Sequence, residues 1–360
     1  MNATLFKHFS IALLGLFPPL FSDLQENMHS SDDKILNKSW QPRSIPNEVA
    51  FKKMWKNSKK AIEEHAKKDF NFSYAPLQEG LPSIEALTSN QELAPLNFSH
   101  SAAEAIGVRD FMEDAHFFKE LEQGILIGVL DGHGGSLVAQ YASERFSQKF
   151  SEALVKTLGN VHQAFEALIH EIHQEVAEKT EWSDIGSTAV LCYVNKYTHI
   201  IYTATLGDSE ANIYRKNDEG HFQSIPLSCV RDWSSIKDAK RAAIALKNPY
   251  IASMWPKVGN PKQLRYPSPF FGINISRSIG DIAFAPAVIH KPKITINRLQ
   301  VNDILILGCD GLKDYVLENE IVDQLHQNEP NENLAERLVN YAISIKNSLD
   351  NVTIATLHIE

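Results

Sequence analysis

Cysteine is scarce in this sequence, whose 360 residues include 3 cysteines, Cys192, Cys229 and Cys309. Their odd number and irregular spacing exclude a disulfide framework and a zinc site built from paired cysteines. All three lie in or near apolar runs, which is typical of small core residues in a reducing compartment. The scarcity of cysteine therefore favours a domain that works in a cytosol.

The sequence also lacks long apolar runs and an excess of positive charge. The apolar run from Phe9 to Phe21 follows Lys7 and is interrupted by two prolines. It is shorter than the roughly 20 residues that span a bilayer. No A-x-A cleavage site follows it, so a signal peptide, a membrane-associating segment and a buried arm stay open for residues 1–22. The net charge of −9 argues against a nucleic-acid-binding protein, which normally carries a basic field.

Residues 23–96 form an extension in which we predict one helix, over residues 47–70. Phe51, Ile62 and Ala66 fall on one stripe of that helix, and lysines are frequent between Lys52 and Lys68. A basic helix of this kind could bind a membrane surface or a partner. We favour the interpretation that the helix packs its apolar stripe on the main domain and leaves the lysines in solvent.

From residue 97 onward, strand-length apolar runs alternate with turns and with longer helical stretches. Turns join neighbouring runs more often than helices do, which favours antiparallel sheets. Helices placed between pairs of strands favour an α+β fold in which helices cover sheets. The predicted strands are Gly124–Leu130, Ser187–Val194, His199–Leu206, Ala211–Arg215, Ile294–Arg298, Asp303–Gly308 and Val352–Ile359. The predicted helices are Ser136–Leu158, Asn160–Lys179, Asp232–Leu246, Glu318–Gln327 and Asn331–Ser348.

Acidic residues stand at the ends of several predicted strands. Asp131 and Asp310 each follow an apolar run and precede a glycine, Asp350 precedes the last run, and Glu113 and Asp114 form an acidic pair. A single carboxylate at a strand end is usually a turn or cap residue, but two Asp-Gly steps after buried strands weaken that explanation. Carboxylates gathered at strand ends repel one another unless a cation lies among them. Hard oxygen ligands select Mg²⁺ or Mn²⁺ rather than zinc.

Other chemistries find little support. The stretch DGHGGS is similar to the His-Gly-Gly oxyanion loop of lipases, but the G-x-S-x-G motif that this chemistry needs is absent. His170 and His173 offer a weak metal-binding signal on a helix. Because no H-E-x-x-H motif is present, we interpret them as surface histidines. Neither a P-loop nor a G-x-G-x-x-G phosphate loop occurs.

Seven motifs carry a family resemblance: GVRDFMEDAHF, GVLDGHGG, DIGSTAVLCYV, YTATLGDSEANIYR, GINISRSIGD, LGCDGLKDYV and DNVTIATLHI. In this order they resemble the metal-dependent protein phosphatases of the 2C type, over about residues 97–360. The resemblance implies a four-layer α-β-β-α sandwich, two antiparallel sheets covered by helices. It also implies a site for two Mg²⁺ or Mn²⁺ ions at one end of the sandwich, where a metal-bridging water attacks phosphoserine or phosphothreonine.

The resemblance assigns roles to individual residues. Asp131 matches the carboxylate that bridges the two metals, and the backbone of Gly132 matches a ligand of the second one. Asp310 and Asp350 match the remaining carboxylate ligands. Glu113 and Asp114 match the acidic pair that acts through water or the outer shell, and Arg109 matches the arginine that grips the phosphate. His133 lies next to this cluster and is the candidate that protonates the departing serine or threonine oxygen.

Two departures from the family pattern put the substrate preference in question and leave the metal ligands in place. Glu210 stands where the family usually has arginine, and Asp232-Trp233 stands where it usually has Asp-His. Asp232 is the candidate for a weaker third metal. Residues 234–271 correspond to the variable flap beside the active site.

These features predict a metal-dependent phosphoprotein phosphatase. The alternative is a phosphatase-like scaffold or regulatory binding protein without turnover. We expect a phosphoprotein substrate, no nucleic acid, a monomer and a catalytic domain in the cytosol. The apolar residues 1–22 leave export or membrane contact open. Asn351 starts an N-x-T glycosylation site directly beside Asp350, and a glycan there would obstruct the metal site, which argues against passage through a eukaryotic secretory pathway.

Overall fold

The computed structural model describes residues 93–247, 264–265, 272–327 and 333–360, all of which lie in the compact unit Lys52–Glu360. The apolar segment of residues 1–22, the basic helix predicted over 47–70 and much of the flap lie outside the described residues. Among the described residues, no helix is long and apolar enough to cross a membrane.

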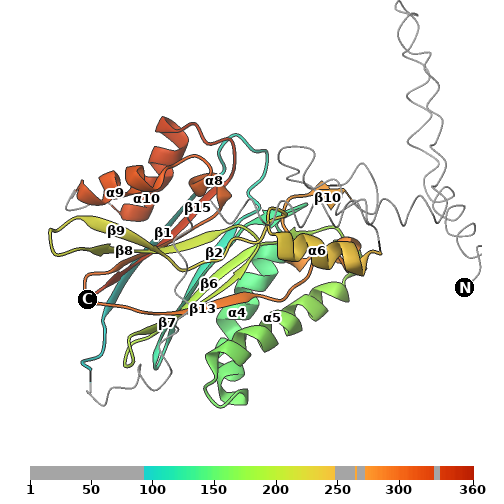
Figure 1. Cartoon of the computed structure of the whole chain (residues 1–360), viewed down its shortest axis with the longest axis horizontal. Helices are drawn as coiled ribbons and strands as arrows, with labels where there is room; N and C mark the ends of the chain where they lie inside the picture. Colours follow the sequence, from blue (N-terminus) through green and yellow to red (C-terminus); the bar gives the residue numbers. More distant parts are fainter. Residues whose placement is uncertain (1–92, 248–263, 266–271, 328–332) are drawn as a thin grey trace, which may run out of the picture. The chain divides into compact units, whose positions relative to one another are not determined.

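Two five-stranded antiparallel sheets form the centre of the fold (Figure 1). The first sheet has the order β1 (Phe98–Ala105), β15 (Val352–Ile359), β14 (Ile304–Gly308), β8 (Glu210–Lys216) and β9 (Phe222–Pro226). The second has the order β13 (Lys293–Arg298), β7 (Ile200–Leu206), β6 (Ala189–Asn195), β3 (Gly124–Leu130) and β2 (Ala115–Leu121).

Strand β3 shows why the sequence of the second sheet is apolar on both faces. All seven of its residues are buried. Ile125 and Ile127 join the cluster that packs the two sheets together, whereas Leu126 and Leu130 join the cluster beneath the helices. Full burial of an isoleucine or leucine side chain contributes about 1.5–3 kcal/mol. The continuous apolar run therefore serves two cores at once.

Helices cover the outer face of each sheet (Figure 1). α4 (Leu137–Lys156) and α5 (Val161–Ala177) pack on the second sheet, and α10 (Leu334–Asn340) packs on β1 and β15 of the first. α8 (Asp310–Lys313) and α9 (Glu318–His326) lie on the same side as α10 (Figure 1). This arrangement confirms the predicted α+β sandwich of four layers.

The predicted elements differ from the observed ones in a few places. The predicted strand Ser187–Val194 is interrupted, because Thr188 donates its backbone N–H to the carbonyl of Asp131 instead of continuing the ladder. The result is a short strand β5 (Gly186–Ser187) ahead of β6. The predicted helix Asn331–Ser348 ends earlier, as α10 gives way to a π-helical turn, Tyr341–Ile345.

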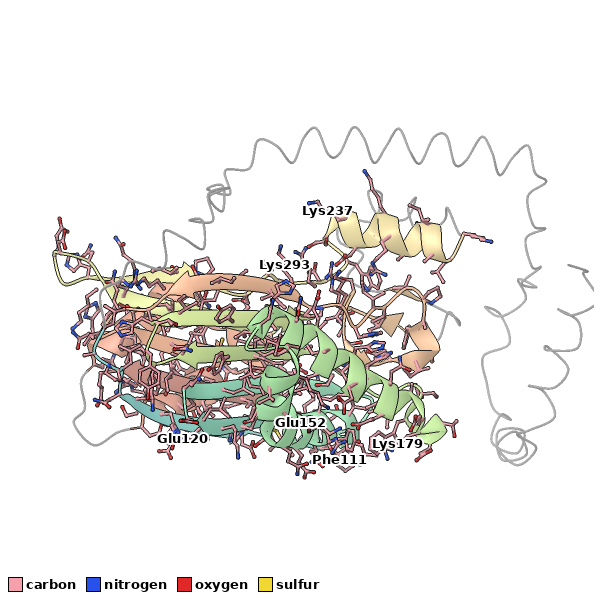
Figure 2. All side chains as sticks on the ribbon, turned by 90° about the horizontal axis from the view of Figure 1, so that it is seen from below. Phe111, Glu120, Glu152, Lys179, Lys237 and Lys293 are labelled. Carbon is pink, nitrogen blue, oxygen red and sulfur yellow. The ribbon has the colours of Figure 1, made fainter. Side chains whose placement is uncertain are left out.

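Three smaller elements border one end of the sandwich. β5 is the central strand of a small sheet with β4 (Gly132–His133) and β12 (Ile279–Gly280). β10 (Leu264–Arg265) pairs with β11 (Gly272–Ile273). α6 (Ile236–Ala245) is the described helix of the flap and presents Lys237 to solvent (Figure 2). It is fixed to the chain by a bidentate ion pair, in which Asp238 accepts hydrogen bonds from Arg277 at 3.0 and 2.8 Å.

The three cysteines are free, as the sequence indicates. Cys192 and Cys309 are buried and Cys229 is half-buried. Burial raises the pKa of the Cys192 thiol to about 12, so this residue is an unreactive part of the core between the sheets.

Candidate active site

A cavity of about 230 Å³ opens at the end of the sandwich where the acidic strand ends meet. Among the described residues, it is lined by Arg109, Glu113, Asp131, Gly132, His133, Thr188, Asp208, Gly272, Ile273, Asn274, Ile275, Asp310, Asp350 and Asn351. Every predicted site residue lines it except Asp114 and Asp232. The structure therefore brings together residues that are separated by up to 241 positions in the chain, Arg109 and Asp350.

Strand pairing explains how the carboxylates converge. Asp131 follows β3, Asp310 begins α8 two residues after β14, and Asp350 lies two residues before β15. Because β14 and β15 are antiparallel, with Gly308 opposite Ile354, the end of one strand meets the start of the other. Residues placed at those two ends must share one edge of the sheet.

Burial and mutual repulsion make this cluster unfavourable as bare carboxylates. Burial, followed by the charges of Asp310 and Asp114, raises the pKa of Asp131 well above its usual value. Burial, followed by the charges of Asp208 and Asp350, raises the pKa of Asp310 to about 6. Both shifts have the sign expected of oxygen ligands that lack a neutralising cation.

Asp114 lies behind the cavity wall and belongs to the same acidic cluster. Its side chain is almost fully buried, and its Oδ2 has no hydrogen-bond partner among the described residues. Burial raises its pKa to about 7. One oxygen each of Asp114 and Asp131 and the sulfur of Cys309 lie within 4.8 Å of one another.

The donor set of this cavity fits a hard divalent cation. Burial raises the pKa of the Cys309 thiol well above its usual value, and Thr353 donates its backbone N–H to that sulfur at 3.2 Å. A neutral thiol is a poor metal ligand. The remaining donors are carboxylate and backbone oxygens, which suit Mg²⁺ or Mn²⁺ better than zinc.

A family comparison fits the same residues. The model described as Protein phosphatase 2C matches residues 98–352. The chain belongs to the protein phosphatase 2C family. This membership confirms the resemblance carried by the seven motifs, and phosphatases of the 2C family are metal-dependent.

Curated phosphatase 2C relatives show how far the similarity extends. Protein phosphatase 2C 77 of Arabidopsis thaliana is 33% identical over 226 residues, which cover 58% of this chain and 46% of that protein. Protein phosphatase 2C 1 of Paramecium tetraurelia is 26% identical over 270 residues, 67% of this chain and 82% of that protein. The chain thus spans about half the length of the Arabidopsis relative.

A solved phosphatase 2C structure confirms the fold. The serine-threonine phosphatase 2C of Toxoplasma gondii superposes with a TM-score of 0.60 at 17% sequence identity. The match covers 75% of this chain and 98% of that one. The similarity supports the two packed sheets and their helices.

Asn351 is a residue of this phosphatase 2C site that sequence reasoning considered only as a glycosylation acceptor. Its side chain accepts the backbone N–H of Glu113 at 2.9 Å and donates to the carbonyls of Ile106 and Phe111. It therefore fixes the loop that carries Arg109 and Glu113. With 5% of its surface exposed and all of these bonds made, Asn351 is inaccessible to a glycan in the folded domain.

Asp208 also lines the phosphatase 2C cavity, and sequence reasoning did not name it as a site residue. Lys313 donates to its backbone carbonyl, and Lys313 Nζ lies 3.4 Å from its Oδ2. The available signal was the Gly-Asp step after the buried strand β7, where Gly207 adopts a φ of 80°. A left-handed glycine turns the chain so that the next side chain faces the strand ends.

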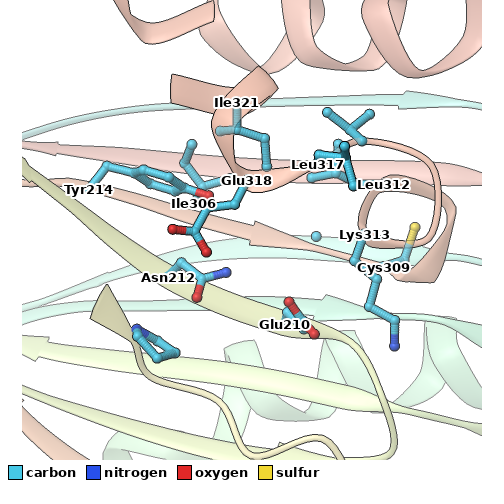
Figure 3. Close-up of a pocket in the computed structure, with 13 residues that line it drawn as sticks. Glu210, Asn212, Tyr214, Ile306, Cys309, Leu312, Lys313, Leu317, Glu318 and Ile321 are labelled. Atoms are coloured by element: carbon cyan, nitrogen blue, oxygen red, sulfur yellow. The ribbon is translucent and has the colours of Figure 1, made fainter. Parts of the chain in front are cut away.

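The charge reversal at Glu210 falls in a different cavity of the phosphatase 2C domain, of about 290 Å³ (Figure 3). Glu210 and Asn212 of β8 line it from one side, and Lys313 and Ile321 line it from the helices. Burial raises the pKa of Glu210. Since Glu210 does not line the site cavity, this departure leaves the carboxylate cluster intact.

The second departure from the phosphatase 2C pattern, Asp232-Trp233, has a structural explanation in the segments that border the flap. Trp233 is fully buried, and its indole N–H donates to the carbonyl of Ile273 at 2.9 Å. Ile273 lines the site cavity, so Trp233 anchors part of the cavity wall. The carboxylate of Asp232 accepts the backbone N–H of Ser234 at 2.8 Å. The structure thus does not bring Asp232 to the cavity, and its role at a third metal stays a prediction.

Proposed function

We propose that this chain is a metal-dependent protein serine/threonine phosphatase that hydrolyses phosphoserine and phosphothreonine in proteins. The observation that carries the proposal is the single cavity that joins Asp131, Asp310 and Asp350 with Arg109 and His133. Hydrolysis of a phosphate monoester needs three components: oxygen ligands for metal ions, a positively charged side chain that binds the phosphate, and a proton donor.

We assign the cofactor as two Mg²⁺ or Mn²⁺ ions. Asp131, Gly132, Asp310 and Asp350 would hold them, and Glu113 and Asp114 would act through water or from the outer shell. When bound, such ions supply Lewis-acid activation of water and neutralise charge on the phosphoryl oxygens. The orphaned oxygen of Asp114 and the raised pKa values of Asp131 and Asp310 support this assignment.

Two further residues act on the substrate in this proposal. The guanidinium of Arg109 presents a fork of N–H donors to the phosphoryl oxygens and fixes their orientation. His133 donates a proton to the serine or threonine oxygen as the P–O bond breaks, which a poor leaving group requires. The carboxylate of Asp281 raises the pKa of His133 although burial alone would lower it, which favours the proton-carrying form.

The proposal extends to the surroundings of the site. We assign a catalytic domain over residues 97–360 with a flap over 234–271 that sets substrate preference. We further assign phosphoproteins rather than nucleic acids as partners, a monomeric state, and action in a cytosol. We assign location or membrane contact to the N-terminal residues. These are residues 1–22, a signal-like segment or a buried arm, and residues 23–96, which carry the basic helix.

Phosphate release from a phosphothreonine peptide distinguishes an enzyme from a phosphatase-like scaffold. We expect release that depends on added Mg²⁺ or Mn²⁺ and stops in excess chelator. A scaffold would bind the peptide in a pull-down or by fluorescence anisotropy without releasing phosphate. Binding without phosphate release at any tested metal concentration would establish that alternative.

A further inference from the structure

The small sheet β4–β5–β12 places two polar side chains against each other beside the site cavity. His133 of β4 and Gly280 of β12 both pair with Gly186 of the central strand β5. Asp281 follows Gly280 directly. The register of three short strands therefore delivers the Asp281 carboxylate to the ring of His133, although 148 positions separate the two residues.

The contact between these side chains is close and well supported. Nε2 of His133 lies 2.9 Å from each carboxylate oxygen of Asp281. The Asp281 side chain is fully buried and also accepts a hydrogen bond from the hydroxyl of Ser278. Its backbone N–H donates to the carbonyl of Ile185 at 3.0 Å. Asp281 also adopts a left-handed φ of 55°, which a non-glycine residue keeps only where its surroundings hold it there.

Gly186 leaves the space in which the two side chains meet. A Cβ on this residue would lie 2.2 Å from Oδ2 of Asp281 and 2.5 Å from Nε2 of His133. Any side chain at this position would therefore separate the histidine from the carboxylate. The three strands, the left-handed turn and the glycine thus all favour the hydrogen bond between His133 and Asp281.

The direction of that bond fixes the ring of His133. Because an ionised carboxylate only accepts hydrogen bonds, Nε2 of His133 carries the hydrogen. His133 lines the cavity and Asp281 does not, so Nδ1 is the ring nitrogen left for a bound substrate. We propose that Asp281 is a positioning residue that holds His133 with Nδ1 directed to the departing serine or threonine oxygen.

This inference rests on the proposed function and adds a second residue to its proton-transfer step. The proton on Nδ1 passes to the seryl or threonyl oxygen as the P–O bond breaks, and His133 is left neutral with its hydrogen on Nε2. Asp281 keeps its hydrogen bond to Nε2 throughout and holds the ring in the orientation that the transfer needs. An aspartate that orients a histidine in this way acts through geometry and tautomer rather than by taking the proton itself.

Two substrates separate this positioning role from a purely structural one. A phosphoserine peptide has a poor leaving group that needs a proton, whereas p-nitrophenyl phosphate has a leaving group that departs without one. We expect Asp281→Asn to lower kcat on the peptide by about 100-fold, the usual size of a lost general acid. The loss on p-nitrophenyl phosphate should be at least tenfold smaller. The exposed neighbour variant Asp184→Asn should leave both rates unchanged.

A double variant tests whether Asp281 acts through His133. His133→Ala should show the same substrate pattern as Asp281→Asn, and the combination of both should lose no more activity than His133→Ala alone. Equal losses on the two substrates, or additive losses in the double variant, would overturn the proposal and leave Asp281 with a structural role.

Histidine-selective ¹⁵N NMR of the wild-type protein and of His133→Ala tests the pairing without an activity assay. We expect one Nε2–H resonance protected from solvent, which disappears in His133→Ala. Its absence would contradict the hydrogen bond on which the inference depends. If the wild type releases phosphate from neither substrate, the proposed function fails while this spectrum still tests the pairing. If the wild type is active and Asp281→Asn behaves like the wild type, the inference alone fails.

Discussion

Arg109 and Asp350 form an ion pair at the exposed side of the site cavity, with Nη2 of Arg109 2.6 Å from Oδ2 of Asp350. The sequence assigns these two side chains to different ligands, the arginine to phosphate and the aspartate to a cation. A carboxylate engaged by a divalent cation has less charge to offer an arginine. We therefore expect cation binding at Asp350 and phosphate binding at Arg109 to favour each other.

Replacement of Arg109 should separate substrate binding from cation binding. We expect Arg109→Ala to raise KM for a phosphopeptide by roughly 10- to 150-fold, equivalent to about 1.5–3 kcal/mol for hydrogen bonds to a charged group. Calorimetric affinity for Mn²⁺ should stay the same or rise, because the arginine no longer competes for Asp350. Lys119→Ala, on the exposed side of β2, is the matched control. A collapse of Mn²⁺ affinity in Arg109→Ala would refute the assigned role.

Asp310→Asn should lower phosphatase activity and raise the stability of the metal-free fold. Because the pKa of Asp310 is raised to about 6, its ionisation destabilises the metal-free fold above the usual value near 4, and the cost is complete above about 6. Its cost should decline as the pH falls from about 7 toward the usual value near 4. In chelator at pH 7.5 we expect the variant to gain about 1–3 kcal/mol in urea unfolding, and the gain should shrink at pH 5. A variant less stable than the wild type in chelator would contradict this account of the cluster.

Glu175 should make the domain sensitive to acid at a place remote from the site. It links α4 to α5, accepting hydrogen bonds from Arg145, Lys149 and Tyr141. Its pKa is lowered to about 2, chiefly by Arg145. A lowered carboxyl pKa stabilises the fold above the unfolded value near 4.5, and this contribution is lost as the pH falls toward 2.

The variant Glu175→Gln tests the ion pairs that Glu175 forms with Arg145 and Lys149. Urea unfolding at pH 7, 4 and 3 should show a shallower loss of stability in Glu175→Gln than in the wild type. Phosphatase activity at pH 7 should be retained, because Glu175 does not line the cavity. A steeper acid dependence in the variant would show that another group controls the transition.

A chain that begins at Leu93 should fold and retain phosphatase activity. Leu96 is buried between the sheets, and its backbone N–H donates to the carbonyl of Lys196. His199 lies 2.9 Å from the carbonyl of Ala94. These contacts are the reason to begin the chain a few residues ahead of the predicted boundary at 97. Circular dichroism and Mn²⁺-dependent activity of residues 93–360 are the measurements. Loss of activity in a folded truncation would make residues 1–92 part of the catalytic machinery.

Apolar strands were the easiest part of the fold to predict from sequence. Runs such as that of β3 fill two cores and leave little freedom in their assignment. β1 was not predicted, because its sequence FSHSAAEA is rich in alanine and serine, residues without a strong preference for strands. Its conformation is imposed by pairing with β15 along all eight residues, from Phe98 opposite Ile359 to Ala105 opposite Val352. Such long-range pairing leaves no local pattern.

The site residues likewise divide into those that a local sequence pattern predicts and those that depend on long-range contacts. Asp131, Asp310 and Asp350 could be predicted because a carboxylate beside a buried strand contrasts with its neighbours, although their assignment to phosphatase chemistry required the family resemblance. Asp281 and Asn351 could not, because their roles depend on a buried contact made only after distant segments meet. His173 illustrates the limit for surface residues. Of the two histidines expected at the surface, His170 is exposed, whereas His173 is half-buried and stacks on His290 with ring centroids 3.8 Å apart.

The most direct test of the central claim compares wild type, Asp131→Asn and Asp218→Asn in one Mn²⁺ titration of phosphothreonine-peptide hydrolysis. Asp218 is exposed in the turn after β8, so its variant controls for the loss of one negative charge. The account predicts that wild type and Asp218→Asn gain activity with Mn²⁺ and lose it in chelator, whereas Asp131→Asn is at least ~100-fold slower throughout. Full activity in chelator, or near-normal turnover by Asp131→Asn, would contradict the assignment of this cavity as a metal-dependent phosphatase site.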